Sequence, residues 1–214
     1  MSAPVQALHD TAGSAPRLLL KGLVFAVCVV LVAPLILATW LEKRLLGTEI
    51  VFVSLSQLLS LVPALPGTWL RGAFYWGALE RCSWQVHVGF GSIFSHRGAR
   101  LGERASIGNY CVLGHADVGD AVMIGSRVSI PSGKRQHFDD EGCLTSGTRF
   151  DRVSIGEHAW LGEGAIVLAD VGARSVVSAG AVVTKPMPAG VLVGGNPARV
   201  IRSIENVDPA GGAD

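Results

Sequence analysis

Charged residues are scarce in this sequence, and neither sign predominates. Asp, Glu, Lys and Arg make up 16% of the 214 residues, where about 25% is typical of soluble domains. Hydrophobic residues reach 49%, the mean hydropathy is +0.42, and the formal net charge is +1. This composition excludes a disordered chain and a nucleic-acid-binding tail protein, and it gives no reason to expect a polyanionic partner.

Cysteine is also scarce, and its spacing excludes the common paired motifs. The four cysteines are Cys28, Cys82, Cys111 and Cys143, and no two of them form a CxxC pair. This spacing favours reduced thiols in a core or a membrane over a disulfide framework or a zinc site. We therefore expect no metal, and a working part that faces a reducing compartment.

The longest hydrophobic run lies near the N-terminus, after a polar tail at 1–16. Residues 22–41 carry no charge, and basic residues flank the run on both sides. Twenty residues in a helix span the hydrocarbon core of a bilayer, which is about 30 Å thick. We predict a transmembrane helix within 17–47. A signal peptide, whose apolar region is usually shorter, and a buried core helix are the alternatives.

A second apolar stretch, 50–65, is short for a membrane span. It predicts a re-entrant or surface-lying helix within a membrane-interface segment at 48–85. Next comes the aromatic segment TWLRGAFYW. Such a segment suits the lipid headgroup zone, or it caps the first coil of a folded domain; the residues leave both open.

Glycine becomes abundant after about residue 86: 21 of the 27 glycines lie at or beyond Gly89. An aliphatic residue followed by glycine or another small residue recurs every six residues, with a few shorter steps. These aliphatic residues are Leu101, Ile107, Leu113, Val118, Ile124, Ile130, Ile155, Leu161, Val167, Val171, Val177 and Val183. Small or β-branched residues follow most of them four positions later: Ala105, Cys111, Val122, Val128, Ala159, Ala165, Ser175 and Ala181.

A six-residue period has a specific structural meaning. Alternation at period two makes short strands, and a glycine in every hexad bends the chain after each strand. Three strands then close a triangular coil, and stacked coils bury ladders of aliphatic side chains. The sequence predicts a parallel β-helix, whose hand the period does not fix.

The pattern resembles the hexapeptide-repeat acyltransferases, over about 86–204. The most similar stretch ends in VVTK followed by GNPARVI, which is typical of the acetyl-CoA branch with its xenobiotic, maltose, galactoside and polysaccharide O-acetyltransferases. The resemblance implies an all-β fold, a left-handed parallel β-helix of hexapeptide repeats, here preceded by N-terminal membrane helices. A short tail at 205–214 would complete the chain.

The hexads are interrupted at 131–153, and this excursion contains His137. Acyl transfer to an alcohol needs a base for the hydroxyl proton, and histidine is the usual base near neutral pH. The resemblance implies that His137 fills this role. Asp139 and Asp140 are candidates to orient its imidazole, by analogy with other carboxylate-oriented bases, although solvation and turn capping are the favoured explanation of both aspartates.

Two further histidines are candidates for substrate binding. His96 and His115 each follow a predicted strand, so both could also be ordinary turn residues. His115 forms an H-x4-D pattern with Asp120, similar to a glycerol-phosphate acyltransferase motif. The hexad explains both residues without that chemistry.

The resemblance also implies acetyl-CoA, or another acyl-CoA, as co-substrate, bound in a groove beside the coils. The matching positions are Trp160, Gly162, Ala179, Thr184, Lys185, Arg199 and Arg202. Lysine and arginine complement phosphate charge. No Walker A or GxGxxG pattern is present, so nucleotide binding by those devices is not expected.

These features together predict an acyl-CoA-dependent O-acyltransferase of the cytoplasmic (inner) membrane, with its catalytic domain facing the cytoplasm. The anchor indicates a membrane lipid environment and a glycan or lipid-linked acceptor, and the resemblance implies a homotrimer. A non-enzymatic β-helix scaffold and an N-acyltransferase remain alternatives. A γ-class carbonic anhydrase is disfavoured because no two histidines lie five residues apart.

Overall fold

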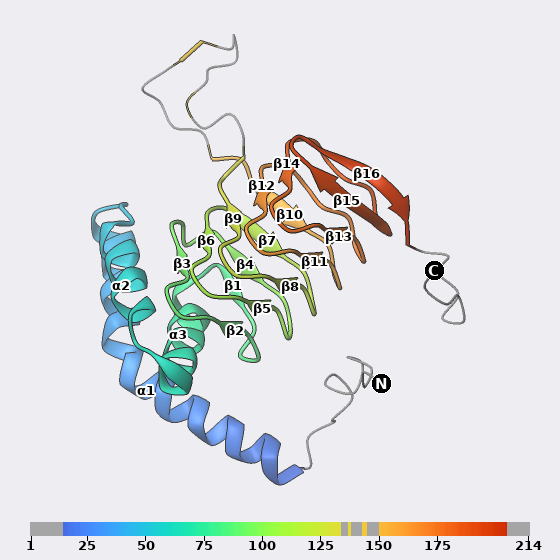
Figure 1. Ribbon diagram of the computed structural model, residues 1–214. Coiled ribbons are helices and arrows are strands. Elements are labelled where there is room, and N and C mark those ends of the chain that lie inside the picture. The colour runs from blue at the N-terminus through green and yellow to red at the C-terminus, as the bar shows by residue number, and fades with distance from the viewer. Residues whose placement is uncertain (1–14, 134–136, 138–142, 145–149, 205–214) are drawn as a thin grey trace.

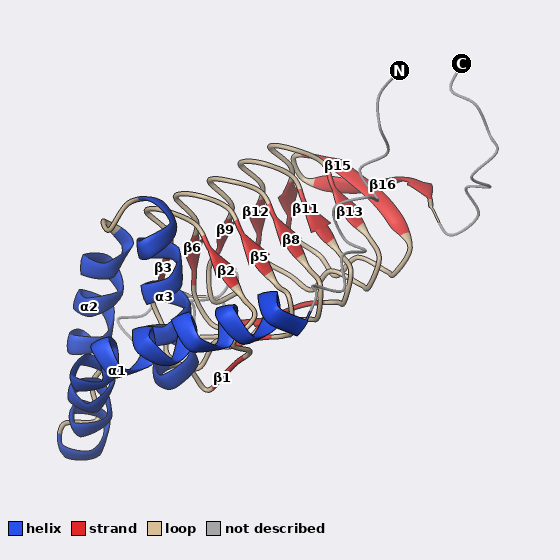
Figure 2. Cartoon of the chain, turned by 90° about the horizontal axis from the view of Figure 1, so that it is seen from below, coloured by secondary structure: helices blue, strands red, loops and turns tan. Residues whose placement is uncertain are grey.

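The chain folds as three helices followed by a stack of triangular coils (Figure 1). The structure is a computed structural model and describes residues 15–133, 137, 143–144 and 150–204. The helices are α1 (Ala15–Leu45), α2 (Ile50–Ser60) and α3 (Ala64–Ala78). Figure 2 shows α2 and α3 at one end of the stack, with the long α1 passing α3 and extending beyond that end.

Three parallel sheets form the sides of the coils. Sheet A contains β1 (Arg81–Cys82), β4 (Arg100–Leu101), β7 (Ala116–Val118) and β10 (Val153–Ile155). Sheet B contains β2 (His87–Val88), β5 (Ser106–Ile107), β8 (Met123–Ile124), β11 (Trp160–Leu161), β13 (Val176–Val177), β15 (Val191–Gly195) and β16 (Ala198–Ser203). Sheet C contains β3 (Ile93–Phe94), β6 (Val112–Leu113), β9 (Ser129–Ile130), β12 (Ile166–Val167) and β14 (Val182–Val183). The result is a parallel β-solenoid of the left-handed type with about six turns.

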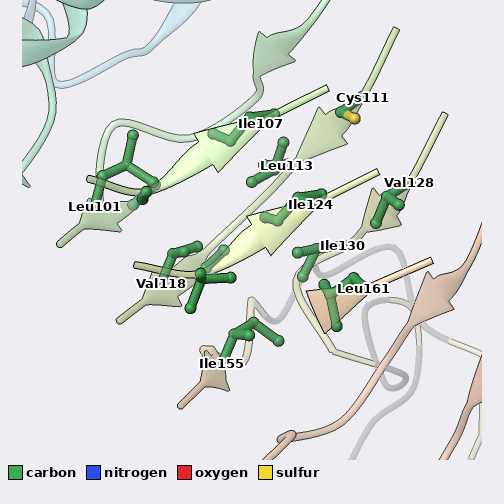
Figure 3. Close-up of a cluster of buried hydrophobic side chains, with 14 of the residues drawn as sticks. Leu101, Ile107, Cys111, Leu113, Val118, Ile124, Val128, Ile130, Ile155 and Leu161 are labelled. Carbon is green, nitrogen blue, oxygen red and sulfur yellow. The ribbon is translucent and has the colours of Figure 1, made fainter. Parts of the chain in front are cut away.

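Buried aliphatic ladders hold the coils together, as the hexad pattern predicts. In sheet B, for example, Ile107 is in register with Ile124, which is in register with Leu161. All twelve predicted ladder residues are at most 4% exposed, and the eight small residues that follow them are buried as well. Figure 3 shows part of this core, where side chains from Leu101 to Leu161 are gathered between the strands. The buried side chains of each coil pack against those of the coil before it. One continuous hydrophobic core therefore runs along the axis of the solenoid.

The hexad glycines act differently from the expectation that they bend the chain. A Cβ at Gly108 would lie 2.6 Å from the backbone N of Ser126 on the next coil. The left-handed backbone falls two residues later, at Tyr110 (φ 56°), and the same spacing recurs from Gly102 to Arg104 (φ 57°). These glycines are therefore required by the close approach of neighbouring coils, while other residue types adopt the positive φ.

The last strands close the C-terminal end of the stack. β15 pairs with β13 in parallel, and β16 folds back to pair with β15 in antiparallel fashion, with a register shift between Leu192 and Val193. This hairpin departs from the hexad repeat and makes β16 the edge strand of sheet B.

The helices α2 and α3 cap the first coil. The hydroxyl groups of Ser56 and Tyr75 lie 2.7 Å apart, and the Ser56 hydroxyl accepts a hydrogen bond from the Phe94 N–H at 3.1 Å. Tyr75 also packs edge-on against the Phe94 ring, with centroids 4.7 Å apart. The aromatic segment was expected either to lie in the lipid headgroup zone or to cap the first coil. Phe74 and Tyr75 are buried at the cap, whereas Trp69 and Trp76 are exposed.

α1 is long and apolar enough to cross a membrane. The candidate span is Leu19–Leu45, 27 residues, whose most apolar 18-residue window has a mean hydropathy of 2.7 and is only 17% buried. The low burial distinguishes α1 from the core helix of a soluble protein, which would be mostly buried. The segment expected to hold one re-entrant helix instead holds two helices, α2 and α3, with Pro63 between them at the N-cap of α3 and Pro66 in the first turn of α3.

Candidate active site

Two predicted histidines lie on one corner of the solenoid, between sheets C and A. His96 follows β3 and His115 follows β6 on the next coil, and their ring centroids are 6.0 Å apart. The excursion leaves the same corner one coil further along, between β9 and β10. The structure therefore brings His96, His115 and the base of the excursion together, and we refer to this region as the histidine corner.

Hydrogen bonds to the backbone of His115 hold both ends of the excursion in place. The His115 N–H donates to the Ser132 hydroxyl at 2.8 Å, and its carbonyl accepts a hydrogen bond from the Val153 N–H at 2.9 Å. The Asp151 N–H donates to the Ser132 carbonyl at 3.1 Å. A Cβ at Gly98 would lie 2.0 Å from His115 Nε2, so the imidazole occupies the space that this glycine leaves free.

His96 has a carboxylate partner from the helical part of the chain. Its Nδ1 lies 2.9 Å from Oε2 of Glu49, in the connection between α1 and α2. Burial of Glu49 opposes ionisation, but the hydrogen bonds from His96 and the Arg97 N–H, together with their charges, outweigh it and lower the pKa of Glu49. The ionised carboxylate can only accept, which makes Nδ1 the protonated nitrogen of His96.

A buried ion pair connects the end of α1 to the same coil. Arg97 donates to the Thr39 carbonyl at 2.8 Å and pairs with Glu42 at 3.3 Å. The carboxylate of Glu42 also accepts hydrogen bonds from the N–H groups of Val51 and Phe52 in the first turn of α2. The ion pair and these hydrogen bonds fix the α1–α2 connection, and with it Glu49, against the solenoid.

His137 is an exposed residue within the excursion. Asp139 and Asp140, which we expected to orient it, lie outside the described residues. The role of this histidine as the base therefore stays a prediction.

The residues predicted to bind the cofactor lie at three places. Gly162 and Ala179 are stacked at the corner between sheets B and C, where a Cβ at Gly162 would lie 2.5 Å from the Ala179 backbone N. Thr184 and Lys185 follow β14 at the corner of the two histidines, two coils beyond the excursion. The remaining positions lie on sheet B: Trp160, half-exposed on β11, and Arg199 and Arg202 on β16.

The cysteines and the acidic groups do not gather into a metal site in the part of the chain that the structure describes. Cys28, Cys82 and Cys111 are buried, and burial raises the pKa of Cys82 to about 12, which keeps it a protonated thiol. Cys143 differs from the expectation of a core or membrane position, because it lies in the excursion and is exposed.

The fold and the six-residue repeat indicate the class of protein. The solenoid is of the kind found in hexapeptide-repeat acetyltransferases. It aligns with a maltose O-acetyltransferase from Clostridium difficile with a TM-score of 0.65 and 25% identity, over 77% of this chain and 91% of that one. It aligns with a hexapeptide-repeat acetyltransferase from Vibrio cholerae, complexed with acetyl coenzyme A, with a TM-score of 0.62 and 23% identity, over 72% and 86% of the two chains. The second likeness is one of fold alone.

Sequence similarity points to the same class. Over 94 residues the chain is 38% identical to the galactoside O-acetyltransferase of Lactococcus lactis, which is 42% of this chain and 44% of that enzyme. The chain thus matches less than half the length of this relative. No protein-family model matches the chain.

The sequence did not predict Glu49 or Phe150 as site residues. Glu49 is 47 positions from His96, and no local motif links the two. Phe150 lies just before β10, with its ring centroid 4.1 Å from that of His96. Only the position of Phe150 within the excursion could have indicated it.

Proposed function

We propose that this chain is a membrane-anchored acyltransferase that moves an acetyl group from acetyl-CoA to a hydroxyl of a glycan or lipid-linked acceptor. One observation carries the proposal: a hexapeptide solenoid with an interrupting excursion, aligned over 91% of a maltose O-acetyltransferase. The sequence similarity to a galactoside O-acetyltransferase supports transfer to oxygen.

The proposed chemistry uses His137, the histidine of the excursion. The acceptor hydroxyl attacks the thioester carbonyl while the imidazole of His137 takes its proton, and a tetrahedral oxyanion forms. The oxyanion collapses, the C–S bond breaks, and CoA leaves as a thiolate that recovers the proton from the imidazolium. The exposure of His137 allows an acceptor to reach it.

The acyl-CoA would bind along the later coils. The small, exposed side chain of Ala179 would leave room at this corner for the pantetheine arm, with Gly162 allowing the close approach of the two coils beneath it, while Lys185, Arg199 and Arg202 would supply positive charge for the phosphates. The three cationic residues lie on two different sides of the solenoid, at the end of β14 and on β16. A homotrimer, in which neighbouring solenoids share each site, would bring such separated groups to one ligand.

The membrane assignment rests on α1. Its exposed apolar side chains include Leu23, Val30 and Leu31, each more than 60% exposed. Placing them in lipid removes this apolar surface from water. The transferase domain, 86–204, would then face the cytoplasm, where acyl-CoA is available.

The test uses the full-length protein purified in detergent. We expect calorimetry to detect acetyl-CoA binding, and radiolabelled acetyl groups to appear in a membrane lipid extract, with the product identified by mass. His137→Ala should lower turnover at least ~100-fold, as loss of a general base does, without changing the fold. The matched control is His87→Gln, since His87 is exposed on sheet B, away from the histidine corner.

Two outcomes would contradict parts of the proposal separately. Unchanged turnover in His137→Ala would remove this histidine from the mechanism. Absence of acetyl-CoA binding would favour the non-enzymatic scaffold. A mass measurement in detergent tests the trimer, and a fully active monomer would rule it out.

A further inference from the structure

We propose that His96, held by Glu49, binds a second hydroxyl of a polyhydroxylated acceptor and so selects which hydroxyl is acetylated. This inference rests on the proposed transferase function and assigns a specificity-determining role to a pair of residues outside the excursion. The pair joins the α1–α2 connection to the first coil of the solenoid, so it places the acceptor beside the helical end of the molecule.

The hydrogen bond to Glu49 decides which nitrogen of His96 is available. Nδ1 donates to the carboxylate at 2.9 Å, so Nε2 is the ring nitrogen left for a ligand, as an acceptor in the neutral ring and as a donor in the charged one. An acceptor nitrogen can receive a hydrogen bond from a hydroxyl. Because the tautomer is fixed before the ligand arrives, the ring presents a hydroxyl-binding group without reorganisation.

Glu49 is itself held in place by the solenoid. Its Oε1 accepts a hydrogen bond from the Arg97 N–H at 3.2 Å, while Oε2 faces His96. The neighbouring Arg97–Glu42 pair already joins the helices to the coil, and its side chains are 9% and 1% exposed. The Glu49–His96 pair is the more accessible of the two contacts, with side chains 34% and 21% exposed, as a ligand-binding pair must be.

The rings around His96 suit a sugar-like ligand. Phe150 lies against the imidazole with centroids 4.1 Å apart and is 42% exposed, and the His115 ring is edge-on at 6.0 Å. An aromatic face packs against the apolar C–H face of a pyranose, while ring nitrogens take up its hydroxyls. An aromatic ring and two imidazoles next to the excursion therefore match a polyhydroxylated headgroup better than a simple alcohol.

The experiment compares two acceptors with the same alkyl chain. Octyl β-D-glucopyranoside offers several hydroxyls, and 2-(octyloxy)ethanol offers a single one. We measure kcat and KM for both with acetyl-CoA and full-length protein in a detergent without hydroxyl groups. The variants are His96→Phe, which keeps a ring but loses both nitrogens, and Glu49→Gln, with His87→Phe and Glu103→Gln as matched controls at exposed positions.

We expect His96→Phe to lower kcat/KM for the glucoside about 10- to 100-fold, mainly through KM, and to change that for the single alcohol less than about 3-fold. Glu49→Gln should change the ratio of the two kcat/KM values, glucoside to single alcohol, in the same direction but less. In the unmodified protein, ¹⁵N NMR of the imidazole should report a proton on Nδ1 of His96, and this proton should lose its fixed position in Glu49→Gln. The controls should match the wild type.

Other results would overturn the inference and leave the transferase function standing. Equal losses for both acceptors in His96→Phe would show that the residue acts in proton transfer or in folding. An unchanged ratio, or a mobile tautomer in the wild type, would show that the pair does not bind the acceptor. If acetyl-CoA does not bind the wild type at all, the transferase function itself fails.

Discussion

The solenoid and the helical end of this chain are stabilised in different ways. The solenoid repeats one local rule, an aliphatic residue every six positions, and all twelve of its ladder residues are buried. The helical end depends on individual polar contacts, such as Arg97 with Glu42 and Arg71 with the carbonyls of Leu59 and Val62. A ladder residue contributes through burial and packing against many neighbours, whereas a buried charge depends on one particular partner.

The largest expected effect comes from breaking the buried ion pair. Arg97→Ala would leave Glu42, whose side chain is 1% exposed, without its cationic partner. We expect a loss of about 3–5 kcal/mol in the free energy of unfolding, since a buried charge is left uncompensated. Urea unfolding followed by circular dichroism measures this loss.

The control for that variant is an exposed pair on the solenoid. Arg127 and Glu163 are 3.9 Å apart, with side chains 72% and 63% exposed. Arg127→Ala should cost only about 0–1 kcal/mol. Equal effects of the two substitutions would contradict the distinction between the helical end and the solenoid.

A ladder substitution should cost somewhat less. Leu161→Ala removes a fully buried side chain from sheet B, and we expect a loss of about 2–5 kcal/mol from lost burial and a cavity. Leu31→Ala on α1, where the leucine is 64% exposed, should change the free energy of unfolding by less than about 0.5 kcal/mol. Denaturant titration of both variants in the same detergent measures the two losses in the free energy of unfolding. A larger loss for Leu31→Ala than for Leu161→Ala would refute this assignment of the core.

Glycine substitutions should change the stability of the fold by a smaller amount. At Gly108 a Cβ would lie 2.6 Å from the next coil, so Gly108→Ala should destabilise the chain by about 1–3 kcal/mol through overpacking. At Gly22 in α1 nothing lies within 4 Å, so Gly22→Ala should stabilise the helix by about 0.5–1 kcal/mol. Thermal melting of the two variants should therefore shift in opposite directions, and a shift in the same direction would count against the close-approach explanation.

The smallest effect concerns pH. Hydrogen bonds from Arg100 and Arg152 lower the pKa of Glu80 from 4.5 to about 2. A carboxyl group with a lowered pKa stabilises the fold above its unfolded value, and this contribution disappears as the pH falls from 4.5 to about 2. Because the Glu80 side chain is 41% exposed, the effect should stay under about 1 kcal/mol.

The check on Glu80 compares the wild type with Glu80→Gln. The free energy of unfolding of the wild type should fall slightly more steeply than that of the variant over this acid range. Parallel curves would mean that the exposed ion pairs around Glu80 add nothing measurable to stability.

The sequence predicted the solenoid well because its physical cause is local. Residues such as Ile107 and Ile124 occupy equivalent places in successive hexads, so a period visible in the letters becomes a ladder in space. It predicted the turns less well, because the tight spacing between coils at Gly108 depends on a neighbour 18 positions away. At the histidine corner, His96 and His115 were identified as candidates, but their proximity depended on the stacking of two coils.

The sequence by itself determined the architecture, the apolar helix and the excursion, because periodicity, hydrophobic length and an interrupted repeat are all properties of neighbouring residues. Only the tertiary structure decided that Glu49 meets His96 and that Arg97 meets Glu42. Both contacts join segments about fifty residues apart, and each carboxylate is fixed by the packing of α1 and α2 against the first coils. Long-range polar contacts of this kind follow from the docking of elements, for which no local pattern exists.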